Sequence, residues 1–338
     1  MAGFCYVNPA RFPAVAFALV VSVSAVKAET AAYDPLKVPD TKILSQALEV
    51  KDAKRNVTIP VRVYLPEGGK PAPVVIFSHG LGGSRDNNPY LGNHWAKRGY
   101  MVVFVQHVGS DESVWKELPV ADRLAAMRKA ASAENLVSRT KDIPAVIDAL
   151  TAWNADKANP LHDRFDLKHL GMSGHSFGAV TTEAVSGEAI AGGRISFTEP
   201  RITASVMMSP SPPSLGDPAK AFAPITVPCL LMTGTQDVAP IGNVTAEDRL
   251  KVFPALANAP AWQVVFDKGT HMSFGERDLM GAAPKDTRYH RAILALTTAF
   301  WDAELKGDKD AKAWLNGDAA RSVLVPEDKW EKNAKAGS

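Results

Sequence analysis

A pentapeptide in the middle of the chain has the residues of a nucleophilic turn. Residues 174–178 read Gly-His-Ser-Phe-Gly, between a predicted strand and a predicted helix. Such a turn is tight, and the glycines are needed because larger side chains at either end would collide with the neighbouring strand and helix. It lifts Ser176 above the sheet edge, at the positive end of a helix dipole. The pattern therefore predicts Ser176 as a nucleophile, with Gly174 and Gly178 shaping the turn; the alternative is a Gly-rich turn that serves packing alone.

A second signal is the Gly-rich loop that follows the apolar run 74–77. Residues 77–83 read Phe-Ser-His-Gly-Leu-Gly-Gly. Acyl transfer needs N–H donors aimed at the developing oxyanion, and each donor lowers the barrier by roughly 3–4 kcal/mol. We assign the two donors to the backbone amides of Leu81 and Phe177. His79 is interpreted as a structural residue of the loop rather than a base, and a flexible surface loop is the competing interpretation.

The nucleophile needs a base, and few candidates follow it in the chain. Only His271 and His290 lie downstream of Ser176. In folds with this turn the chain order is Ser, then Asp or Glu, then His. His271 lies in the loop after the predicted strand 262–266, whereas His290 lies inside a predicted helix. His271 is therefore the predicted base.

The acid that orients the imidazole must also follow a strand. Asp237 comes directly after the predicted strand 229–233. Asp217 lies in a Ser/Pro-rich loop away from a strand end, and Asp267 is only four residues before His271, which makes folding back onto its ring awkward. Asp237 is therefore the predicted acid, with an Asp that merely caps the next turn as the alternative.

The elements that must position these residues alternate between strands and helices. Residues 57–65 have apolar residues at every second position, which predicts a half-buried strand, and Pro60 predicts an edge or a bulge there. Further strands are predicted at 74–77, 101–105, 169–172, 204–208, 229–233 and 262–266, and helices at 90–98, around 143–150, from 178, at 289–305 and around 311–315. This order predicts an α/β fold with a mostly parallel sheet of about eight strands and helices on both faces.

The segments around the predicted site suggest how it could hold a substrate. Ligands on parallel sheets bind at the carboxyl ends of the strands. The Ser/Pro-rich segment 209–224 is expected to border the site, and 115–138 to form a small helical cap. Four apolar residues could form an acyl wall, with plain core as the alternative: Met207, Met208, Phe177 and Met272.

The first 28 residues have the layout of a secretory signal peptide. Arg11 precedes the apolar run 14–23, and the small residues Val26 and Ala28 flank Lys27 before Glu29. A membrane anchor is the rival interpretation, but residues 13–26 would span about 21 Å of helix against a hydrocarbon core of about 30 Å. We therefore expect residues 1–28 to be removed, and residues 29–338 to form one exported catalytic domain, periplasmic or extracellular, with no stable membrane span. A helical and partly loose tail is expected from about residue 307.

Charge and cysteine content exclude several classes. Removing Arg11 and Lys27 from the 38 Lys and Arg residues leaves 36, against 36 Asp and Glu, so no nucleic-acid partner is expected. The mature chain would keep one cysteine, Cys229, inside an apolar run, where a buried role is expected. The histidines are too scattered for a zinc set, so neither a metal nor another cofactor is predicted.

The motifs together resemble a known superfamily. The segments SHGLGG, GHSFG, MTGTQD and GTHMSF look like those of the α/β-hydrolase fold, over roughly residues 47–314. Within it the chain resembles the bacterial dienelactone-hydrolase-like branch, which is similar to platelet-activating-factor acetylhydrolases, chlorophyllases and cutinase-like polyester hydrolases. The resemblance implies Ser176 as nucleophile and Leu81 and Phe177 as oxyanion donors.

Two departures from the resemblance bear on the substrate. Dienelactone hydrolases have a cysteine at the nucleophile position, where this chain has Ser176, which argues against dienelactone. The acetylhydrolases carry their acid after the strand that follows the nucleophile helix, but here residues 207–210 read Met-Met-Ser-Pro. The acid is then expected one strand later, at Asp237, as in cutinase-like enzymes.

Three functions remain open at the level of sequence. The first is an exported serine carboxylesterase that cleaves esters through an acyl-enzyme. The second is an acetylhydrolase or lipase of the platelet-activating-factor type, or a cutinase-like polyester hydrolase. The third is a catalytically silent binding protein on the same fold. Ester substrates, whether small, lipid or polymeric, are the expected partners in the first two.

Overall fold

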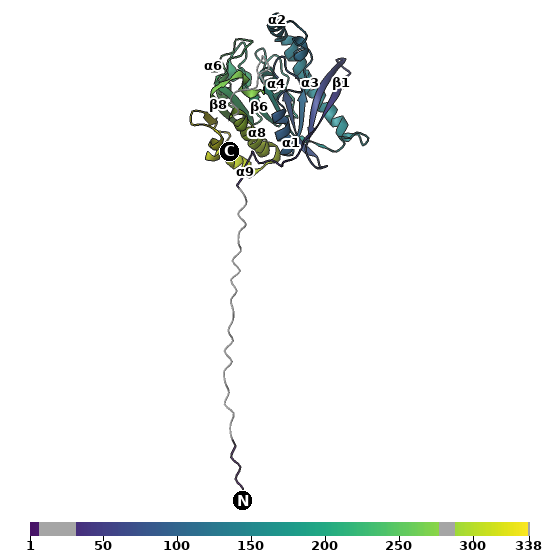
Figure 1. Ribbon diagram of the computed structural model, residues 1–338. Coiled ribbons are helices and arrows are strands. Elements are labelled where there is room, and N and C mark those ends of the chain that lie inside the picture. Colours follow the sequence, from purple (N-terminus) through teal and green to yellow (C-terminus); the bar gives the residue numbers. More distant parts are fainter. Residues whose placement is uncertain (7–31, 277–287, 337–338) are drawn as a thin grey trace. The chain divides into compact units, whose positions relative to one another are not determined.

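The computed structural model describes residues 1–6, 32–276 and 288–336 (Figure 1). The chain divides into two units, Met1–Ala32 and Tyr33–Ser338, and the fold is that of the second. All but the first six residues of the predicted signal peptide 1–28 lie outside the described residues. Within the described residues, no helix combines the length and the apolar character needed to cross a membrane.

A mixed sheet with a parallel centre forms the middle of the second unit. The described strands form one nine-stranded sheet in the order β1-β2-β4-β3-β5-β6-β7-β8-β9. The pairs from β4 through β8 are parallel, whereas β1 and β2, β2 and β4, and β8 and β9 pair antiparallel. The prediction of an α/β-hydrolase fold with a mostly parallel sheet is confirmed.

The strands and helices alternate along the chain as predicted. The strands are β1 (Leu44–Asp52), β2 (Val57–Leu65), β3 (Ala72–Ser78), β4 (Met101–Val105), β5 (Phe165–His175), β6 (Ala204–Met208), β7 (Cys229–Gln236), β8 (Ala261–Thr270) and β9 (Lys329–Lys332). The α-helices are α1 (Pro89–Lys97), α2 (Val120–Ala130), α3 (Ala133–Ala155), α4 (Phe177–Ser186), α5 (Pro218–Phe222), α6 (Ala246–Arg249), α7 (Val252–Ala255), α8 (Arg288–Lys306) and α9 (Lys309–Asn316). Short 3₁₀ turns are η1 (Glu112–Val114), η2 (His271–Phe274) and η3 (Asp318–Val323).

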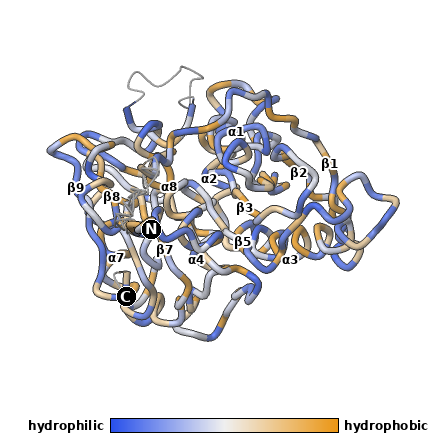
Figure 2. Tube along the Cα trace, turned by 90° about the horizontal axis from the view of Figure 1, so that it is seen from below, coloured by the Kyte–Doolittle hydropathy of each residue, from blue (hydrophilic) through white to orange (hydrophobic). Residues whose placement is uncertain are grey.

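Helices cover both faces of the sheet and create a separate core on each side. Figure 2 shows α1 and α8 on one side of the strands and α3, α4 and α7 on the other. Successive residues of a buried strand point to opposite faces: Val75 and Phe77 of β3 pack with α1 and α8, whereas Val74 and Ile76 pack with α3. Because both faces are buried, the central strands have continuous apolar runs.

The edge predicted at Pro60 is confirmed for the part of β2 that contains it, because residues 57–60 pair in register with β1 alone. β2 is an interior strand, paired with β1 and β4, and Pro60 pairs in register with Glu49. The ladder between β2 and β4 ends at the pair Val61–Val105. Gln106 N donates to the Pro60 carbonyl oxygen at 2.9 Å, but Pro60 has no N–H to donate in return, so the pairing stops there. A proline is therefore tolerated in an interior strand where a shorter neighbour ends.

The C-terminal segment returns to the sheet. After residue 307, where a helical and partly loose tail was expected, the chain forms α9 and η3 and then β9, which pairs with β8.

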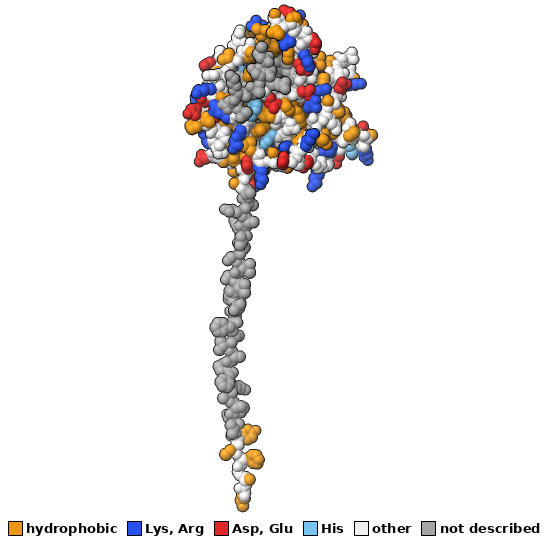
Figure 3. Space-filling model, viewed as in Figure 1, with side chains coloured by type: hydrophobic (Ala, Val, Ile, Leu, Met, Phe, Trp, Pro, Cys, Tyr) orange, Lys and Arg blue, Asp and Glu red, His pale blue; other side chains and the backbone are white. Residues whose placement is uncertain are grey.

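On the face shown in Figure 3, basic and acidic side chains of the second unit are interspersed. This mixture is what the equal numbers of basic and acidic residues after position 28 lead one to expect.

Candidate active site

The turn between β5 and α4 holds Ser176 in a strained backbone conformation. Ser176 has φ 57° and ψ −119°, a combination that residues with a side chain rarely adopt. A Cβ on Gly174 would lie 2.2 Å from the Gly178 carbonyl oxygen, and one on Gly178 would lie 1.9 Å from the carbonyl oxygen of Ser78. Only glycine fits at both ends of the turn, so the local sequence determines its shape. This turn raises the Ser176 side chain above the sheet.

Three side chains from three strand ends meet at this turn. His271 begins η2 after β8, and its Nε2 lies 2.8 Å from Ser176 Oγ. Its Nδ1 lies 2.8 Å from Oδ1 of Asp237, which follows β7. The carboxylate accepts the Nδ1–H bond, which leaves Nε2 as the acceptor for the Ser176 hydroxyl proton. The structure thus brings together Ser176, Asp237 and His271, residues that lie far apart in the sequence.

The carboxylate of Asp237 is buried and fully occupied. Oδ2 accepts hydrogen bonds from Ser209 Oγ at 2.7 Å and Thr233 Oγ1 at 3.0 Å. Arg249 Nε lies 2.9 Å from Oδ1. Burial by itself would raise the pKa of Asp237, but the hydrogen bond from His271 and the charge of Arg249 outweigh it and lower the pKa. Asp237 is therefore ionised at neutral pH, as an acid that orients an imidazole must be.

Arg249 is a residue of this site that the sequence did not reveal. Its side chain is fully buried. Nη1 donates to the carbonyl oxygens of Ser209 at 2.7 Å and Pro210 at 2.9 Å, and Nε donates to the carbonyl oxygen of Asp237 at 2.8 Å. These bonds tie the loops after β6 and β7 together. An arginine in the short helix α6 gives no sequence signal for this role, because arginines usually lie at the surface.

His175, the residue before Ser176, contacts the backbone and the ring of His271. Its Nε2 donates to the carbonyl oxygen of His271 at 3.0 Å, and the two rings lie 4.8 Å apart. Burial, with the neighbouring His271, lowers the pKa of His175 to about 3, so it remains neutral. A neutral ring at this position fixes the backbone of His271 without adding a charge to the site.

The loop after β3 has one peptide held in a fixed orientation. The carbonyl oxygen of Gly80 accepts hydrogen bonds from Gly83 N at 3.0 Å and from His79 Nδ1 at 2.6 Å. The next amide belongs to Leu81, and in a trans peptide its N–H points away from that carbonyl oxygen. A Cβ on Gly80 would lie 3.4 Å from Ser176 Cβ, so this loop packs directly against the serine.

The two amides assigned as oxyanion donors are unengaged. Phe177 is the first residue of α4, where an N–H has no intrahelical acceptor. Among the described residues, neither the Phe177 N–H nor the Leu81 N–H has a hydrogen-bond partner. One free amide therefore adjoins the serine in the chain, and the other belongs to the loop that packs against it, as expected of donors to a developing oxyanion.

The segment expected to form a cap does pack on the predicted oxyanion loop, residues 77–83. Residues 115–138 contain α2 and the start of α3. Trp115 Nε1 donates to the carbonyl oxygen of Gly82 at 2.7 Å, and a Cβ on Gly82 would lie 3.0 Å from the Met127 methyl group. This helical segment therefore covers the glycine-rich turn beside the candidate site.

The rival acid and base residues have other partners. His290 stacks on Tyr90 at 4.2 Å between ring centroids and lies 2.9 Å from the Gly275 carbonyl oxygen. Asp217 caps α5 by accepting from Ala219 N. Asp267 lies 3.8 Å from the Lys268 amine. None of the three rivals contacts Ser176.

The prediction that Met207 and Met208 belong to an acyl wall was wrong. Met207 and Met208 are fully buried and belong to the cores on opposite faces of the sheet. Strand alternation in a sheet that is covered on both sides sends both into the interior. Phe177 and Met272 are half-buried beside the serine and the histidine.

Cys229 is buried in β7, and burial raises the pKa of its thiol.

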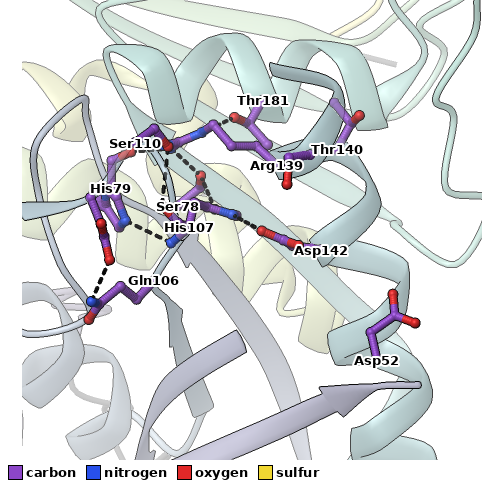
Figure 4. A network of polar contacts seen from close by, with 12 residues as sticks. Asp52, Ser78, His79, Gln106, His107, Ser110, Arg139, Thr140, Asp142 and Thr181 are labelled. Atoms are coloured by element: carbon purple, nitrogen blue, oxygen red, sulfur yellow. Dashed lines mark hydrogen bonds and ion pairs between the residues drawn. The ribbon is translucent and has the colours of Figure 1, made fainter. Parts of the chain in front are cut away.

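A second set of serine, histidine and aspartate lies beneath the oxyanion loop (Figure 4). Ser78 Oγ lies 2.9 Å from His107 Nε2, and His107 Nδ1 lies 2.8 Å from Asp142 Oδ2. Ser78 also accepts from Arg139 Nη2 at 3.0 Å, which leaves its hydroxyl proton for His107. His107 N donates to His79 Nε2 at 3.0 Å. This set, which the sequence did not indicate, is fully buried and connects to the loop through His79.

Comparison with known proteins supports the resemblance. Residues 47–143 match the model of the family described as platelet-activating factor acetylhydrolase, isoform II. The chain resembles this family over that segment, which supports a hydrolase of the esterase type. The match covers less than a third of the chain, and it includes the oxyanion loop but ends before Ser176, Asp237 and His271. A search of curated proteins found no match.

Proposed function

We propose that the protein is a serine carboxylesterase that cleaves carboxylic esters through an acyl-enzyme. The observation that carries the proposal is the chain of two 2.8 Å contacts from Ser176 through His271 to Asp237. The strained turn and the two free amides support it. Serine nucleophiles require this combination of base, orienting acid and oxyanion donors.

The reaction follows from which atoms can accept the proton. His271 Nε2 takes the hydroxyl proton as Ser176 Oγ attacks the ester carbonyl carbon, and the N–H groups of Leu81 and Phe177 bind the oxyanion. Collapse of this intermediate breaks the bond to the alcohol oxygen, which leaves with the proton from His271. A water molecule, deprotonated by the same histidine, attacks the acyl carbon. Collapse then breaks the bond to Ser176 Oγ, which takes the proton back from His271, and releases the acid. Asp237 stays ionised and holds the imidazole in the Nδ1–H tautomer.

Platelet-activating-factor-type acetylhydrolase activity is the second candidate. The family match over residues 47–143 favours it. The position of the acid argues against a close correspondence, because the end of β6 carries Ser209, whose hydroxyl donates to Asp237 on the next strand. A cutinase-like polyester hydrolase fits this acid position, as the sequence resemblance implies. A series of p-nitrophenyl esters of increasing chain length, with a short-acyl phospholipid and a polyester film beside it, separates these substrates.

A catalytically silent binding protein is the non-enzyme alternative. A protein that no longer catalyses a reaction commonly loses one of its catalytic residues by mutation. Here Ser176, His271 and Asp237 are all present and in contact. Replacing Ser176 with Ala tests the enzyme directly. We expect hydrolysis of p-nitrophenyl acetate to fall by about 10⁵-fold or more, with unchanged circular dichroism. Wild-type turnover in this variant would refute the proposed nucleophile, and an inactive wild-type protein would favour the binding role.

We also propose that the protein is exported and that residues 1–28 are its signal peptide. The short apolar run 14–23 and the small residues before Glu29 support this. Expression of the full chain in a bacterial host, followed by fractionation and intact-mass measurement, tests it. The expected product begins at Glu29 in the periplasm or medium, and an uncleaved chain in the membrane fraction would support an anchor instead.

A further inference from the structure

Arg139 is a buried cation that lies beneath the oxyanion loop. It extends from α3, has no solvent exposure, and its guanidinium points toward Ser78, Ser110 and Thr181 in Figure 4. Nη1 donates to Ser110 Oγ at 2.9 Å and Nε to Thr181 Oγ1 at 2.9 Å. Nη2 donates to Ser78 Oγ at 3.0 Å and to the carbonyl oxygen of His79. Four of its five N–H groups are therefore used: two on Ser78 and His79 at the end of β3, one on Ser110 after β4 and one on Thr181 of α4.

All of these acceptors are neutral. Among the described residues, no carboxylate forms an ion pair with Arg139; the nearby Asp142 is engaged by His107 and by Arg55 Nη2 at 2.7 Å. Burial lowers the pKa of Arg139 to about 9, so it stays charged at neutral pH. A buried charge without an ionic partner costs stability. Such a residue therefore calls for a role that offsets this cost.

Arg139 joins the two segments that carry the free amides. On one side it binds the carbonyl oxygen of His79, two residues before Leu81. On the other, its guanidinium carbon lies 4.6 Å from the centroid of the Phe177 ring. Thr181, which accepts from Arg139, itself donates to the Phe177 carbonyl oxygen at 2.9 Å. One side chain thus holds the loop and the first turn of α4 in a fixed relation.

We propose that Arg139 is a positioning residue for the oxyanion hole, which sets the spacing of the Leu81 and Phe177 amides and places a positive charge behind them. The inference rests on the proposed esterase function. Negative charge on the substrate oxygen is present in the transition state and absent in the bound ester, so the contribution falls on kcat rather than KM.

The test compares Arg139→Met and Arg139→Lys with a matched variant of another arginine in the same network. Arg55→Lys alters a residue that binds Asp52 and Asp142 but contacts neither the loop nor α4. Turnover of p-nitrophenyl acetate is divided by the active-site concentration, titrated with a fluorophosphonate. For Arg139→Met we expect kcat to fall by about 30- to 100-fold with KM within about threefold, and for Arg139→Lys a smaller fall. Arg55→Lys should keep kcat within about twofold.

A second measurement separates positioning from a loss of folding. Phenylboronic acid forms a tetrahedral adduct with a reactive serine, so its inhibition constant should rise in proportion to the fall in kcat. If both Arg139 variants fail to fold, Ser110→Ala and Thr181→Val remove single Arg139 partners, and each should lower kcat by about 3- to 10-fold.

The outcomes distinguish this inference from the proposed function. An active wild type and an inactive Ser176→Ala variant uphold the esterase. If Arg139→Met then folds and its kcat per active site stays within threefold of wild type, the inference is refuted and the esterase function stands. If Arg139→Met does not fold, a kcat within threefold of wild type in both Ser110→Ala and Thr181→Val has the same meaning. A wild type that neither hydrolyses an ester nor reacts with the fluorophosphonate refutes both.

Discussion

The molecule contains two sets of serine, histidine and aspartate with nearly the same distances and different surroundings. In the first set, Ser176, His271 and Asp237 are joined by two contacts of 2.8 Å. In the second, the contacts from Ser78 to His107 and on to Asp142 are 2.9 Å and 2.8 Å. The first serine is half-buried at a strained turn, and the second is fully buried at the end of β3 in regular strand geometry.

The difference gives a physical reason to propose a nucleophile in only one of two sets with similar hydrogen-bond geometry. Ser176 is half-buried, with free amides at Phe177 and in the loop that packs against it, whereas Ser78 accepts a hydrogen bond from Arg139 and lies in the interior. Burial, followed by the charges of Arg139 and Arg55, lowers the pKa of His107 well below its ordinary range, so it is a poor proton acceptor. We therefore propose that the first set is catalytic and that the second supports the loop after β3.

The histidines should give the largest contrast. His271→Gln removes the base that accepts the Ser176 proton, and kcat for p-nitrophenyl acetate should fall by about 10⁵-fold or more. His107→Gln should keep kcat per active site within about threefold but lower the free energy of unfolding by about 1–3 kcal/mol, because buried partners lose their hydrogen bonds. Urea denaturation and ester hydrolysis measure the two effects. A similar loss of kcat in both variants would break the distinction between the sets.

The aspartates should give the next largest contrast. An asparagine at position 237 favours the wrong imidazole tautomer, so Asp237→Asn should lower kcat by about 10⁴-fold. Asp142→Asn changes a carboxylate that does not contact His271, and kcat should stay within about threefold. Initial rates at saturating p-nitrophenyl acetate test both variants. A loss above about 100-fold in Asp142→Asn would place the buried set in the catalytic mechanism.

Ser209 should have a smaller effect. Its hydroxyl donates to Asp237 Oδ2 at 2.7 Å, beside the bond from Thr233 at 3.0 Å. Ser209→Ala leaves the second donor in place, so kcat should fall by only about 3- to 10-fold. Ser205→Ala is the matched control, since Ser205 bonds Ser186 within the core and contacts no member of the site. Equal effects in the two variants would show that Ser209 acts only through general stability.

The two carboxylates should also shift stability with pH in opposite directions. Burial, partly offset by Arg55, raises the pKa of Asp142 from 3.8 to about 6. Because the folded state then favours the protonated form, its stabilising contribution is present at low pH and is lost as pH rises from about 4 to 6. The pKa of Asp237 is lowered, so its contribution is present above 3.8 and is lost as pH falls through the folded pKa.

Denaturation at pH 4 and pH 7 tests this opposition. Between these values, wild type should lose on the order of 2 kcal/mol of unfolding free energy relative to Asp142→Asn. If the difference in unfolding free energy between wild type and Asp142→Asn is the same at pH 4 and pH 7, the pKa of Asp142 is not raised. Asp142 and Asp237 would then not have opposite effects on the pH dependence of stability.

Much of the fold could be predicted because the central strands are buried on both faces. Their apolar runs and the glycines at the ends of the helices are clear signals in the sequence. β1 and β9 were not predicted, because β1 is mostly exposed and lacks a regular apolar alternation, and β9 has four residues, none of them buried. Edge strands of this kind depend on a neighbour rather than on their own sequence.

The convergence of Ser176, Asp237 and His271 could be predicted because strand ends of a parallel sheet meet at one edge. The chain order of serine, then acid, then histidine left His271 and Asp237 as the candidates in loops that follow strands. Arg249 and Arg139 could not be predicted, because sequence reasoning places arginines at the surface and both are fully buried here. Long-range packing, which the local sequence does not encode, brings them to the site.

Fluorophosphonate labelling followed by peptide mapping tests the assignment of the nucleophile most directly. The reagent reacts with a serine that is both activated by a base and open to solvent, so we expect one adduct per chain, on Ser176. In His271→Gln the adduct should be lost, and in His107→Gln it should remain. An adduct on Ser78, or a folded wild-type protein with no adduct on Ser176, would contradict the account.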